Sequence, residues 1–209
     1  MPSYKFPSEI VYWTRVNDHE NIKPGLLQKI NEIQTNEKLE NPFSCKMTTN
    51  FGKLEKGISS VHNFLDGENI QKIILEPFKN FLRDTDVFQI KPTGYNVYQY
   101  WFNQYSRGDF QELHDHCVSN FEEDSYPLLS GIYILKSEEK SNNTTFEIKN
   151  KKGIPFHPTI NRMEFDTSDI DDIKEGTVLI FSSTLSHKVK PIEKEGRITI
   201  AFNLSCKFN

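Results

Sequence analysis

The hydrophobic pattern of the chain changes near residue 90, and this change constrains the fold more than any other feature. Upstream of it, apolar residues recur with the period of a helix. The spacing predicts two helical stripes, made of Ile22, Leu26, Leu27, Ile30 and Ile33, and of Ile70, Ile73, Ile74, Phe78, Phe81 and Leu82. Because Pro77 falls inside the second stripe, we expect that helix to kink or restart there. The segment 41–57 between the stripes carries Pro, Gly and Asn and is expected to be irregular.

Downstream of residue 90, short runs rich in Tyr, Phe, Val, Ile and Thr alternate with turn residues, which is typical of strands. Strands are predicted over 95–105, 110–116, 128–135, 144–149, 159–165, 177–182, 186–190 and 197–205. About eight short strands at this spacing indicate a sandwich, a jelly roll or a small barrel. With 209 residues, the chain is expected to form a single domain. In it, residues 1–90 give mostly helical support and residues 91–209 form a mainly β core of an α+β fold.

Composition excludes several classes of protein. Aromatic residues make up 12% of the chain and charges of both signs are mixed, which argues against disorder. No apolar run approaches the roughly 20 residues of a membrane helix. The first residues show neither the basic nor the apolar region of a secretory signal. We therefore expect a cytoplasmic protein, in the host cytoplasm if a phage encodes it.

Charge and cysteine usage narrow the function further. The net charge is −4, and the longest basic run is Lys151–Lys152, so a nucleic acid is not an expected partner. Cys45, Cys117 and Cys206 are odd in number and widely spaced. This spacing argues against a disulfide framework and against a zinc site made of thiolates.

Two histidines lie two residues apart in the run Leu113-His114-Asp115-His116-Cys117. On a strand, His114 and His116 point to the same face and Asp115 points away. Two imidazoles on one face suit a divalent metal ion of intermediate softness. Taken alone, however, such a pair is more often two exposed histidines at a strand end.

A third histidine and an arginine make a metal site the favoured interpretation. His187 follows an apolar strand that begins after Gly176, and Arg197 and Thr199 share one face of the last predicted strand. Three neutral imidazoles can hold Fe(II) with open positions, and a guanidinium can bind a carboxylate through two parallel hydrogen bonds.

A third segment is compatible with the same site. Asn103 and Tyr105 share a face of the first predicted strand, and Gly108 permits the chain to reverse direction before His114. An ordinary aromatic hairpin would explain this segment equally well. Tyr133 could line the same pocket or belong to the core.

The order NxYxxG…HxH…H…RxT resembles the iron(II)- and 2-oxoglutarate-dependent dioxygenases. The resemblance extends over residues 95–205 and is greatest to a branch found in marine bacteria and their phages. It rests on Trp101-Phe-Asn103-Gln-Tyr105, His114-Asp-His116, Leu129-Ser-Gly-Ile-Tyr-Ile-Leu135, Gly176 to His187, and Arg197-Ile-Thr199-Ile-Ala-Phe-Asn203. It implies a double-stranded β-helix, the cupin-like jelly roll, with supporting N-terminal helices.

The resemblance also implies cofactors and residue roles. Fe(II) would be held by His114, His116 and His187. The cosubstrate 2-oxoglutarate would chelate the iron, with its distal carboxylate bound by Arg197 and assisted by Thr199, Tyr105 and Asn103. Together with O2, these cofactors would hydroxylate a substrate, either a peptide side chain such as proline or a small metabolite.

Three alternatives remain open at this point. Most of the superfamily uses His-x-Asp, so Asp115 could replace His116 if the strand ends in a bulge, although strand alternation favours His116. A cupin-like dioxygenase with three histidines would not need 2-oxoglutarate, but it would leave Arg197 and its neighbours without a role. A non-catalytic jelly-roll binding module would have no use for the three histidines.

Overall fold

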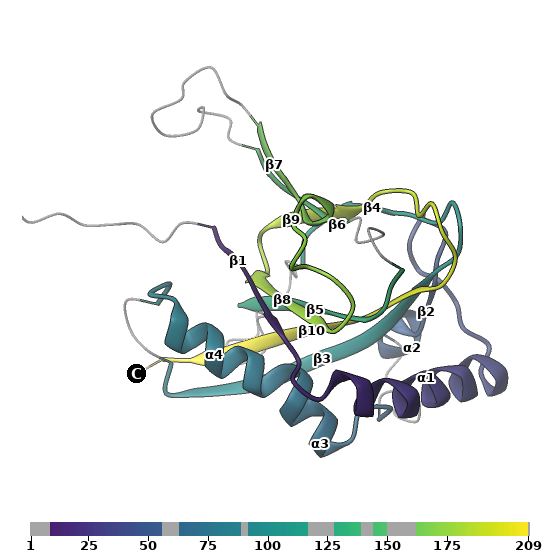
Figure 1. Cartoon of the computed structure of the whole chain (residues 1–209), viewed down its shortest axis with the longest axis horizontal. Helices are drawn as coiled ribbons and strands as arrows, with labels where there is room; N and C mark the ends of the chain where they lie inside the picture. The colour runs from purple at the N-terminus through teal and green to yellow at the C-terminus, as the bar shows by residue number, and fades with distance from the viewer. Residues whose placement is uncertain are drawn as a thin grey trace, which may run out of the picture.

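The computed structural model describes residues 9–55, 63–88, 92–116, 128–138, 144–149 and 162–208. Two antiparallel sheets form the body of the protein, and the helices lie along one side of the larger sheet (Figure 1). Among the described residues, no helix is both long and apolar enough to cross a lipid bilayer.

The larger sheet has six strands in the order β1-β8-β5-β10-β3-β2. Their bounds are β1 Val11–Arg15, β2 Thr48–Thr49, β3 Gly94–Tyr105, β5 Leu129–Lys136, β8 Thr177–Ser182 and β10 Arg197–Lys207. The long strand β10 lies between β3 and β5 and pairs with both over most of its length. The strand β10 therefore lies inside the sheet, and its first residue, Arg197, is placed beside β3.

The smaller sheet has four strands in the order β4-β9-β6-β7. Their bounds are β4 Gln111–His114, β6 Thr144–Lys149, β7 Arg162–Asp166 and β9 Ser186–Val189. Apolar side chains of both sheets pack into one cluster that includes Ile132, Phe146, Leu179 and Phe181. This two-sheet arrangement is the jelly roll expected from the strand pattern.

The short helix α2 Phe51–Glu55 packs on Trp101 of β3 through Phe51, and a short 3₁₀ turn at Thr167–Asp169 contacts β6 of the smaller sheet. The outer face of the larger sheet is covered by α1 His19–Asn36, α3 Gly67–Ile70 and α4 Glu76–Asp84, with a π-helical turn at Gln71–Leu75. Their buried apolar residues, such as Ile30 and Phe78, join Phe202 of β10 and Ile180 of β8 in the main core. Burial of this stripe, rather than helix propensity, accounts for the stability of such short helices.

The predicted elements agree with the structure in most places and differ in a few. As expected, the helix pattern restarts at Pro77, which lies in the first turn of α4 after the π-helical turn. The segment 41–57 is not wholly irregular, because it contains β2 and α2. Strand β1 was not expected, since its five residues precede α1 in a stretch too short for a period to show.

Boundaries account for the other differences. The expected strand at 110–116 ends at His114, and part of the expected strand at 159–165 lies outside the described residues. Residue 117 also lies outside them, whereas Cys45 and Cys206 carry free thiols.

Candidate functional site

His114 and His187 meet because their strands are paired. His114 is the last residue of β4, and it lies directly opposite His187 of β9 in the register of the smaller sheet. Side chains opposite each other on one face of an antiparallel pair lie close together. The two ring centroids are accordingly 4.3 Å apart.

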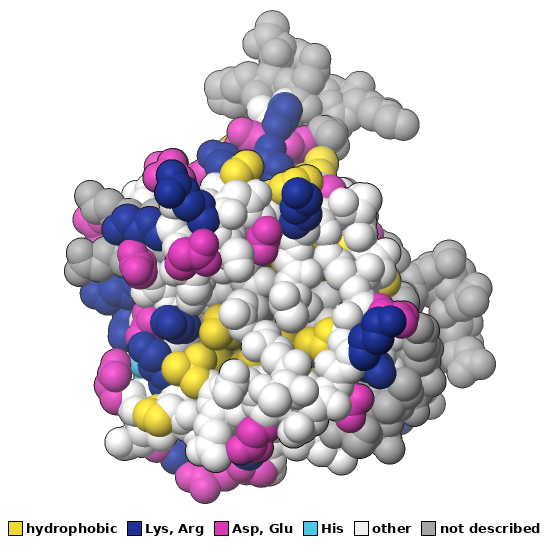
Figure 2. Space-filling view, turned by 90° about the vertical axis from the view of Figure 1, so that its right-hand side faces the viewer, with side chains coloured by type: hydrophobic (Ala, Val, Ile, Leu, Met, Phe, Trp, Pro, Cys, Tyr) yellow, Lys and Arg dark blue, Asp and Glu magenta, His cyan; other side chains and the backbone are white. Residues whose placement is uncertain are grey.

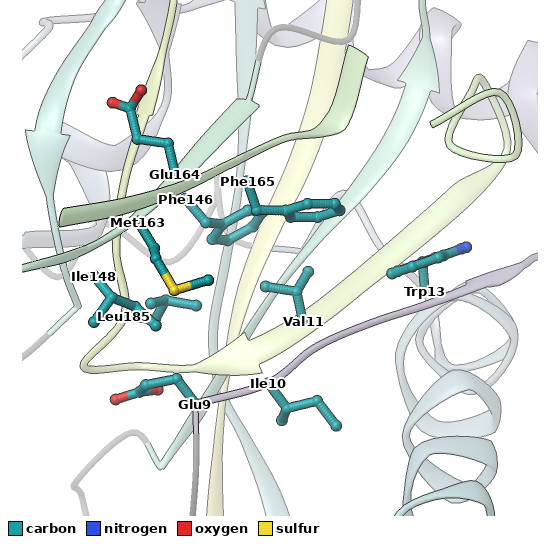
Figure 3. Close-up of a pocket in the computed structure, with 10 residues that line it drawn as sticks. All are labelled: Glu9, Ile10, Val11, Trp13, Phe146, Ile148, Met163, Glu164, Phe165 and Leu185. Carbon is teal, nitrogen blue, oxygen red and sulfur yellow. The ribbon is translucent and has the colours of Figure 1, made fainter. Parts of the chain in front are cut away.

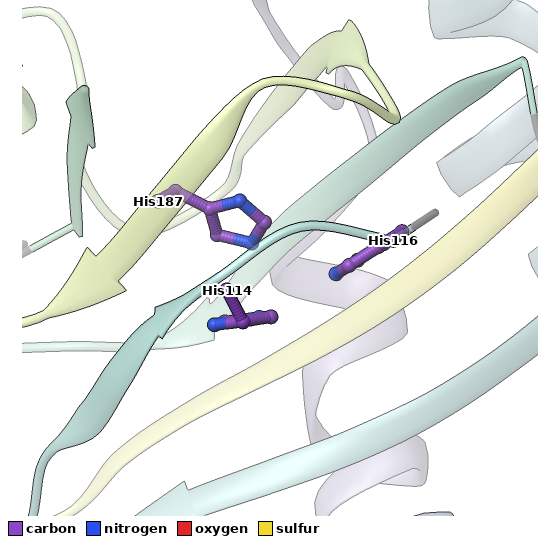
Figure 4. Close-up of side chains that lie close together, drawn as sticks. All are labelled: His114, His116 and His187. Atoms are coloured by element: carbon purple, nitrogen blue, oxygen red, sulfur yellow. The ribbon is translucent and has the colours of Figure 1, made fainter. Parts of the chain in front are cut away.

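His116 joins them from beyond the end of β4. Its backbone N–H donates to the carbonyl oxygen of Ser183 at 2.9 Å, which ties this segment to the end of β8. Its ring centroid lies 5.5 Å from that of His114 and 5.0 Å from that of His187. One ring nitrogen from each of the three histidines lies within 4.8 Å of the others (Figure 4).

Backbone carbonyls fix the orientation of two of the rings. Nδ1 of His114 lies 2.8 Å from the carbonyl oxygen of Glu112, and Nδ1 of His187 lies 3.0 Å from that of Leu185. A carbonyl oxygen can only accept, so each Nδ1 must carry the proton. Nε2 is then the unprotonated nitrogen in both rings, as a metal ligand requires.

A side chain performs the same task for His116. Its Nδ1 lies 2.8 Å from Oδ1 of Asn203 and 2.8 Å from Oγ of Ser130. Since the amide oxygen of Asn203 only accepts, Nδ1 donates to it and Nε2 is left unprotonated.

The pKa shifts of all three histidines favour the neutral imidazole. Burial lowers the pKa of His114, and burial together with the neighbouring His114 lowers the pKa of His116 to about 4. Burial, reinforced by the other two rings, lowers the pKa of His187 well below its ordinary value. Three imidazoles, each with one ring nitrogen within 4.8 Å of the others, form a donor set that fits a divalent iron ion.

Asp115 takes no part in this convergence. Its side chain is exposed, and the group of potential metal ligands contains the three histidines without it. Strand alternation does not decide the outcome, because the strand has already ended at His114. Instead, the loop places His116 inward through its hydrogen bond to Ser183.

The register of β3 and β10 builds a wall beside the histidines. Tyr105 lies opposite Arg197, Asn103 opposite Thr199, and Trp101 opposite Ala201. These six side chains line the same small cavity as the three histidines. The sequence-predicted residues His114, His116, His187, Arg197, Thr199, Asn103 and Tyr105 are thus all brought together.

The guanidinium of Arg197 is buried with part of its fork open. Nη2 donates to Oγ1 of Thr144 at 2.9 Å, whereas Nε and Nη1 have no hydrogen-bond partner among the described residues. Burial lowers the pKa of Arg197, because charging a group is costly away from water. A buried cation with unused donors fits a carboxylate ligand, which would accept hydrogen bonds from it.

Two further polar groups in this wall lack partners among the described residues. They are Nε1 of Trp101 and Oδ1 of Asn103, and both residues are almost fully buried. An unpaired buried polar atom costs free energy unless a ligand or water satisfies it. These atoms therefore add to the evidence that a polar ligand belongs in the cavity.

Gln111 was not among the sequence-predicted site residues. Its Oε1 accepts from the hydroxyl of Tyr105 at 2.9 Å, and its Nε2 lies 3.3 Å from Nε2 of His114. The cavity leaves only about 20 Å³ of free space, so a five-carbon diacid could enter only after Gln111 or a neighbour moves. The spacing of Gln111 and His114 did not indicate a shared site, because residues three positions apart on a regular strand point to opposite faces.

The structure gives Asn203 a contact that the sequence did not predict, and it places Tyr133 in the core, one of its two expected positions. Asn203 shares the inward face of β10 with Arg197 and contacts His116, a role that its position alone did not reveal. Tyr133 belongs to the main core and does not line the cavity, because its hydroxyl bonds to Nδ1 of His19 at 2.6 Å.

A second group of potential metal ligands contains His19, Glu20 and Glu175. Lys23 and His19 already contact Glu175, and Tyr133 occupies the other ring nitrogen of His19. This group is therefore an ion-paired tie between α1 and the turn before β8.

An apolar groove of about 270 Å³ lies outside the metal site, between β1 and the β6–β7 pair (Figure 3). Trp13 and Phe165 stack with ring centroids 6.0 Å apart at one side of it. Phe146 lines the groove and also packs against His187, with ring centroids 5.7 Å apart. The groove thus shares one side chain with the surroundings of the histidine cluster.

Comparisons with known proteins agree with this geometry. Residues 99–203, half of the chain, match the family of 2OG-Fe(II) oxygenases. No curated protein matches the sequence.

Two solved structures share the fold. A Pseudomonas putida prolyl-4-hydroxylase superimposes with a TM-score of 0.56 at 10% identity, covering 97% of this chain and 95% of that one. The viral collagen prolyl hydroxylase of Paramecium bursaria Chlorella virus-1, as a 2-oxoglutarate complex, gives a TM-score of 0.52 at 18% identity. In that case 92% of this chain and 95% of that chain are covered. With its jelly-roll fold and its family match, the chain belongs to the 2OG-Fe(II) oxygenases, the oxidoreductases that use Fe(II) and 2-oxoglutarate.

Proposed function

We propose that His114, His116 and His187 hold the Fe(II) ion through their Nε2 atoms. The single observation that carries this assignment is the convergence of three neutral rings, each with its Nδ1 proton directed to an oxygen. When bound, the iron and 2-oxoglutarate would supply the activation of dioxygen, with loss of CO2 from the cosubstrate, one oxygen atom entering succinate and the other the hydroxylated product. The described residues bind and orient these partners and keep water out.

The wall of β3 and β10 is proposed to bind 2-oxoglutarate. Arg197 would bind the distal carboxylate through its unused hydrogen-bond donors, with hydroxyl groups from Thr199 and Tyr105 nearby. Burial raises the pKa of Tyr105 to about 12, so its hydroxyl stays protonated. Its proton, which is donated to Gln111 in this structure, would turn to the cosubstrate once Gln111 moves. Asn103 would contribute its amide, whose oxygen lacks a partner among the described residues. A dioxygenase that did not use 2-oxoglutarate would leave this cation without a ligand.

For the substrate, we propose a prolyl side chain in a peptide. Two proteins of the same fold are prolyl hydroxylases. The groove beside His187 is lined by Trp13, Phe146 and Phe165, and proline-rich segments dock in aromatic-lined grooves. A small metabolite is the competing class, and free proline serves as its representative in the test.

The charge on one face of the protein does not favour a nucleic acid as the partner. On the face drawn in Figure 2, Lys and Arg side chains of the described residues are interspersed with Asp and Glu and do not form one stripe. A nucleic-acid partner would favour a continuous basic surface. We further propose that the protein acts in the cytoplasm, where free thiols such as Cys45 and Cys206 stay reduced.

Anaerobic titration calorimetry tests the cofactor site. Mn(II), and then 2-oxoglutarate in the presence of Mn(II), should bind to the wild type, whereas His187→Ala should bind neither under the same conditions. Failure of the wild type to bind 2-oxoglutarate in the presence of metal would overturn the proposal.

Succinate release then tests the substrate. A proline-rich peptide should stimulate Fe(II)-dependent succinate formation from 2-oxoglutarate, while free proline should not. Trp13→Ala should weaken the response to peptide and leave 2-oxoglutarate affinity unchanged. Stimulation by free proline alone would reassign the substrate to the small metabolites.

A further inference from the structure

His116 differs from the other two histidines in what accepts its Nδ1 proton. His114 and His187 donate to backbone carbonyls, which no substitution of a side chain removes. His116 donates to Oδ1 of Asn203, a side chain on the central strand β10. The tautomer of one ring in the cluster therefore depends on a single amide.

Asn203 is held so that its oxygen faces His116. The side chain is buried, and its Nδ2 donates to Oε1 of Gln99 at 3.2 Å across the β3–β10 pair. Its Oδ1 also accepts from the hydroxyl of Ser130, which lies opposite it on β5 and touches Ser183. Because Nδ2 is directed to an acceptor and Oδ1 to donors, this orientation of the amide satisfies both ends.

We propose that Asn203 is the positioning residue of the metal centre. Its amide oxygen fixes the Nδ1–H tautomer of His116, leaves Nε2 free for the metal, and adds no negative charge. This inference rests on the proposed role of His116 as a ligand. It goes beyond that role by assigning the tautomer and the net charge of the centre to one residue outside the ligand set.

Ser130 and Asn203 differ in how they can constrain the tautomer of His116. Ser130 can donate or accept, so by itself it would tolerate either tautomer of His116. If its hydroxyl donated to Nδ1, the proton of the ring would reside on Nε2 and would occupy the lone pair needed by the metal. Asn203 excludes this arrangement, because its oxygen cannot donate.

The side chain that accepts the Nδ1 proton of His116 is an amide and not a carboxylate. Metal-bound histidines commonly donate to a carboxylate, which makes the imidazole a stronger ligand. Here all three Nδ1 atoms donate to uncharged oxygens, and an imidazole that binds a metal ion is itself neutral. The centre therefore retains the full positive charge of the ion, which strengthens its attraction for the anionic cosubstrate. An aspartate of the same shape at position 203 would remove part of that charge.

Nitrogen NMR of the metal-free protein tests the tautomer directly. The ¹⁵N shifts of His116 should report protonated Nδ1 and unprotonated Nε2 in the wild type. Ser130→Ala should keep this pattern because Asn203 remains, whereas Asn203→Leu should shift His116 toward the Nε2–H form. A wild-type His116 in the Nε2–H form would overturn the proposal.

Metal titration tests the effect of Asn203 on metal affinity, and voltammetry tests its effect on the charge of the centre. Asn203→Leu should weaken Mn(II) binding by about 10–100-fold, the usual effect of losing a partner of a metal-bound histidine. Asn203→Asp should restore or exceed wild-type Mn(II) affinity and lower the Fe(III)/Fe(II) potential, because the added carboxylate stabilises the more highly charged ion. It should also weaken 2-oxoglutarate binding. Ser182→Ala, a change at the partly exposed end of β8, serves as the matched control.

The outcomes of these experiments distinguish a failure of the role proposed for Asn203 from a failure of the proposed cofactor site. If wild-type protein binds no metal while the NMR pattern is as expected, the site assignment fails and the tautomer assignment stands. If wild type binds metal and Asn203→Leu binds it equally well, Asn203 is not a positioning residue. Should Asn203→Leu fail to fold, an unchanged affinity and potential in Asn203→Asp would overturn the proposal.

Discussion

Arg197 and Tyr105 face each other across the β3–β10 pair, with the guanidinium carbon 5.0 Å from the centroid of the phenol ring. Both side chains are fully buried, and the ring lies against one side of the cation. A cation over an aromatic face is stabilised without using its hydrogen-bond donors. The contact therefore holds the charge in place and leaves Nε and Nη1 available to a carboxylate ligand.

Arg197→Lys should weaken 2-oxoglutarate binding by about 10–100-fold, corresponding to about 1.5–3 kcal/mol for a hydrogen bond to a charged group. The lysine keeps the charge but loses the planar fork. Calorimetric titration of the Mn(II) protein measures the change. Arg162→Lys, at an exposed arginine of β7, is the control and should bind 2-oxoglutarate as the wild type does. An unaltered affinity in Arg197→Lys would remove Arg197 from the cosubstrate site.

His116→Ala should abolish Mn(II) binding, whereas Asp115→Asn should leave it close to that of the wild type. The reason is that His116 turns inward toward the other two rings while Asp115 is exposed. Titration of both variants with Mn(II) gives the comparison. The opposite ranking would mean that Asp115 swings inward and supplies the third ligand.

Tyr133→Phe should lower the free energy of unfolding by about 1–3 kcal/mol, because it leaves Nδ1 of buried His19 without its partner. Tyr100→Phe is the matched control, since its hydroxyl makes only a 3.5 Å contact with the carbonyl oxygen of Leu65. Urea unfolding of both variants provides the measurement. Since Tyr133 lies outside the cavity, 2-oxoglutarate affinity should not change, and a loss of affinity would contradict its placement.

Glu175→Gln should reduce stability at neutral pH and have no effect in acid. Burial raises the pKa of Glu175, but Lys23, the Ser137 N–H and His19 outweigh burial and lower it overall. A carboxylate with a lowered folded-state pKa stabilises the protein above its unfolded pKa of roughly 4.3, and that stability is lost as pH falls through the folded-state value. Because the group is partly exposed, the difference at pH 7 should be at most about 1 kcal/mol.

Thermal unfolding of wild type and Glu175→Gln between pH 7 and pH 3 checks this sign. The two curves should converge as the pH falls below about 4. A gap that widens in acid would show that Glu175 is not stabilised in its charged form.

Gly131→Ala should destabilise the larger sheet by about 1–3 kcal/mol or more. A Cβ at this position would lie 2.1 Å from Cζ of Phe202, so the ring on the neighbouring strand would have to move. Gly25→Ala in α1 is the opposite control: apart from its chain neighbours and the helix backbone, no atom of the described residues lies within 4 Å of a Cβ placed there, and alanine favours the helix by roughly 0.5–1 kcal/mol. Equal and small effects at both positions would contradict the packing of β5 against Phe202.

Much of the fold follows from local patterns in the sequence. The strands β6 and β8 have the predicted bounds, and the second helix restarts at Pro77, because alternation, apolar runs and a missing N–H act within a few residues. By contrast, β1 and β2 were not predicted. They are strands only because distant partners, β8 and β3, supply their hydrogen bonds.

The sequence by itself determined the chemical types of the site residues: three imidazoles and one guanidinium, on segments whose order resembles one family. It could not determine which groups would orient them. His116 lies beyond its strand, so its direction depends on Ser183 and its tautomer on Asn203, which is 87 residues away in the chain. Hydrogen bonds between such distant residues exist only after the sheets have packed, and for that reason tertiary structure alone decided the ligand geometry.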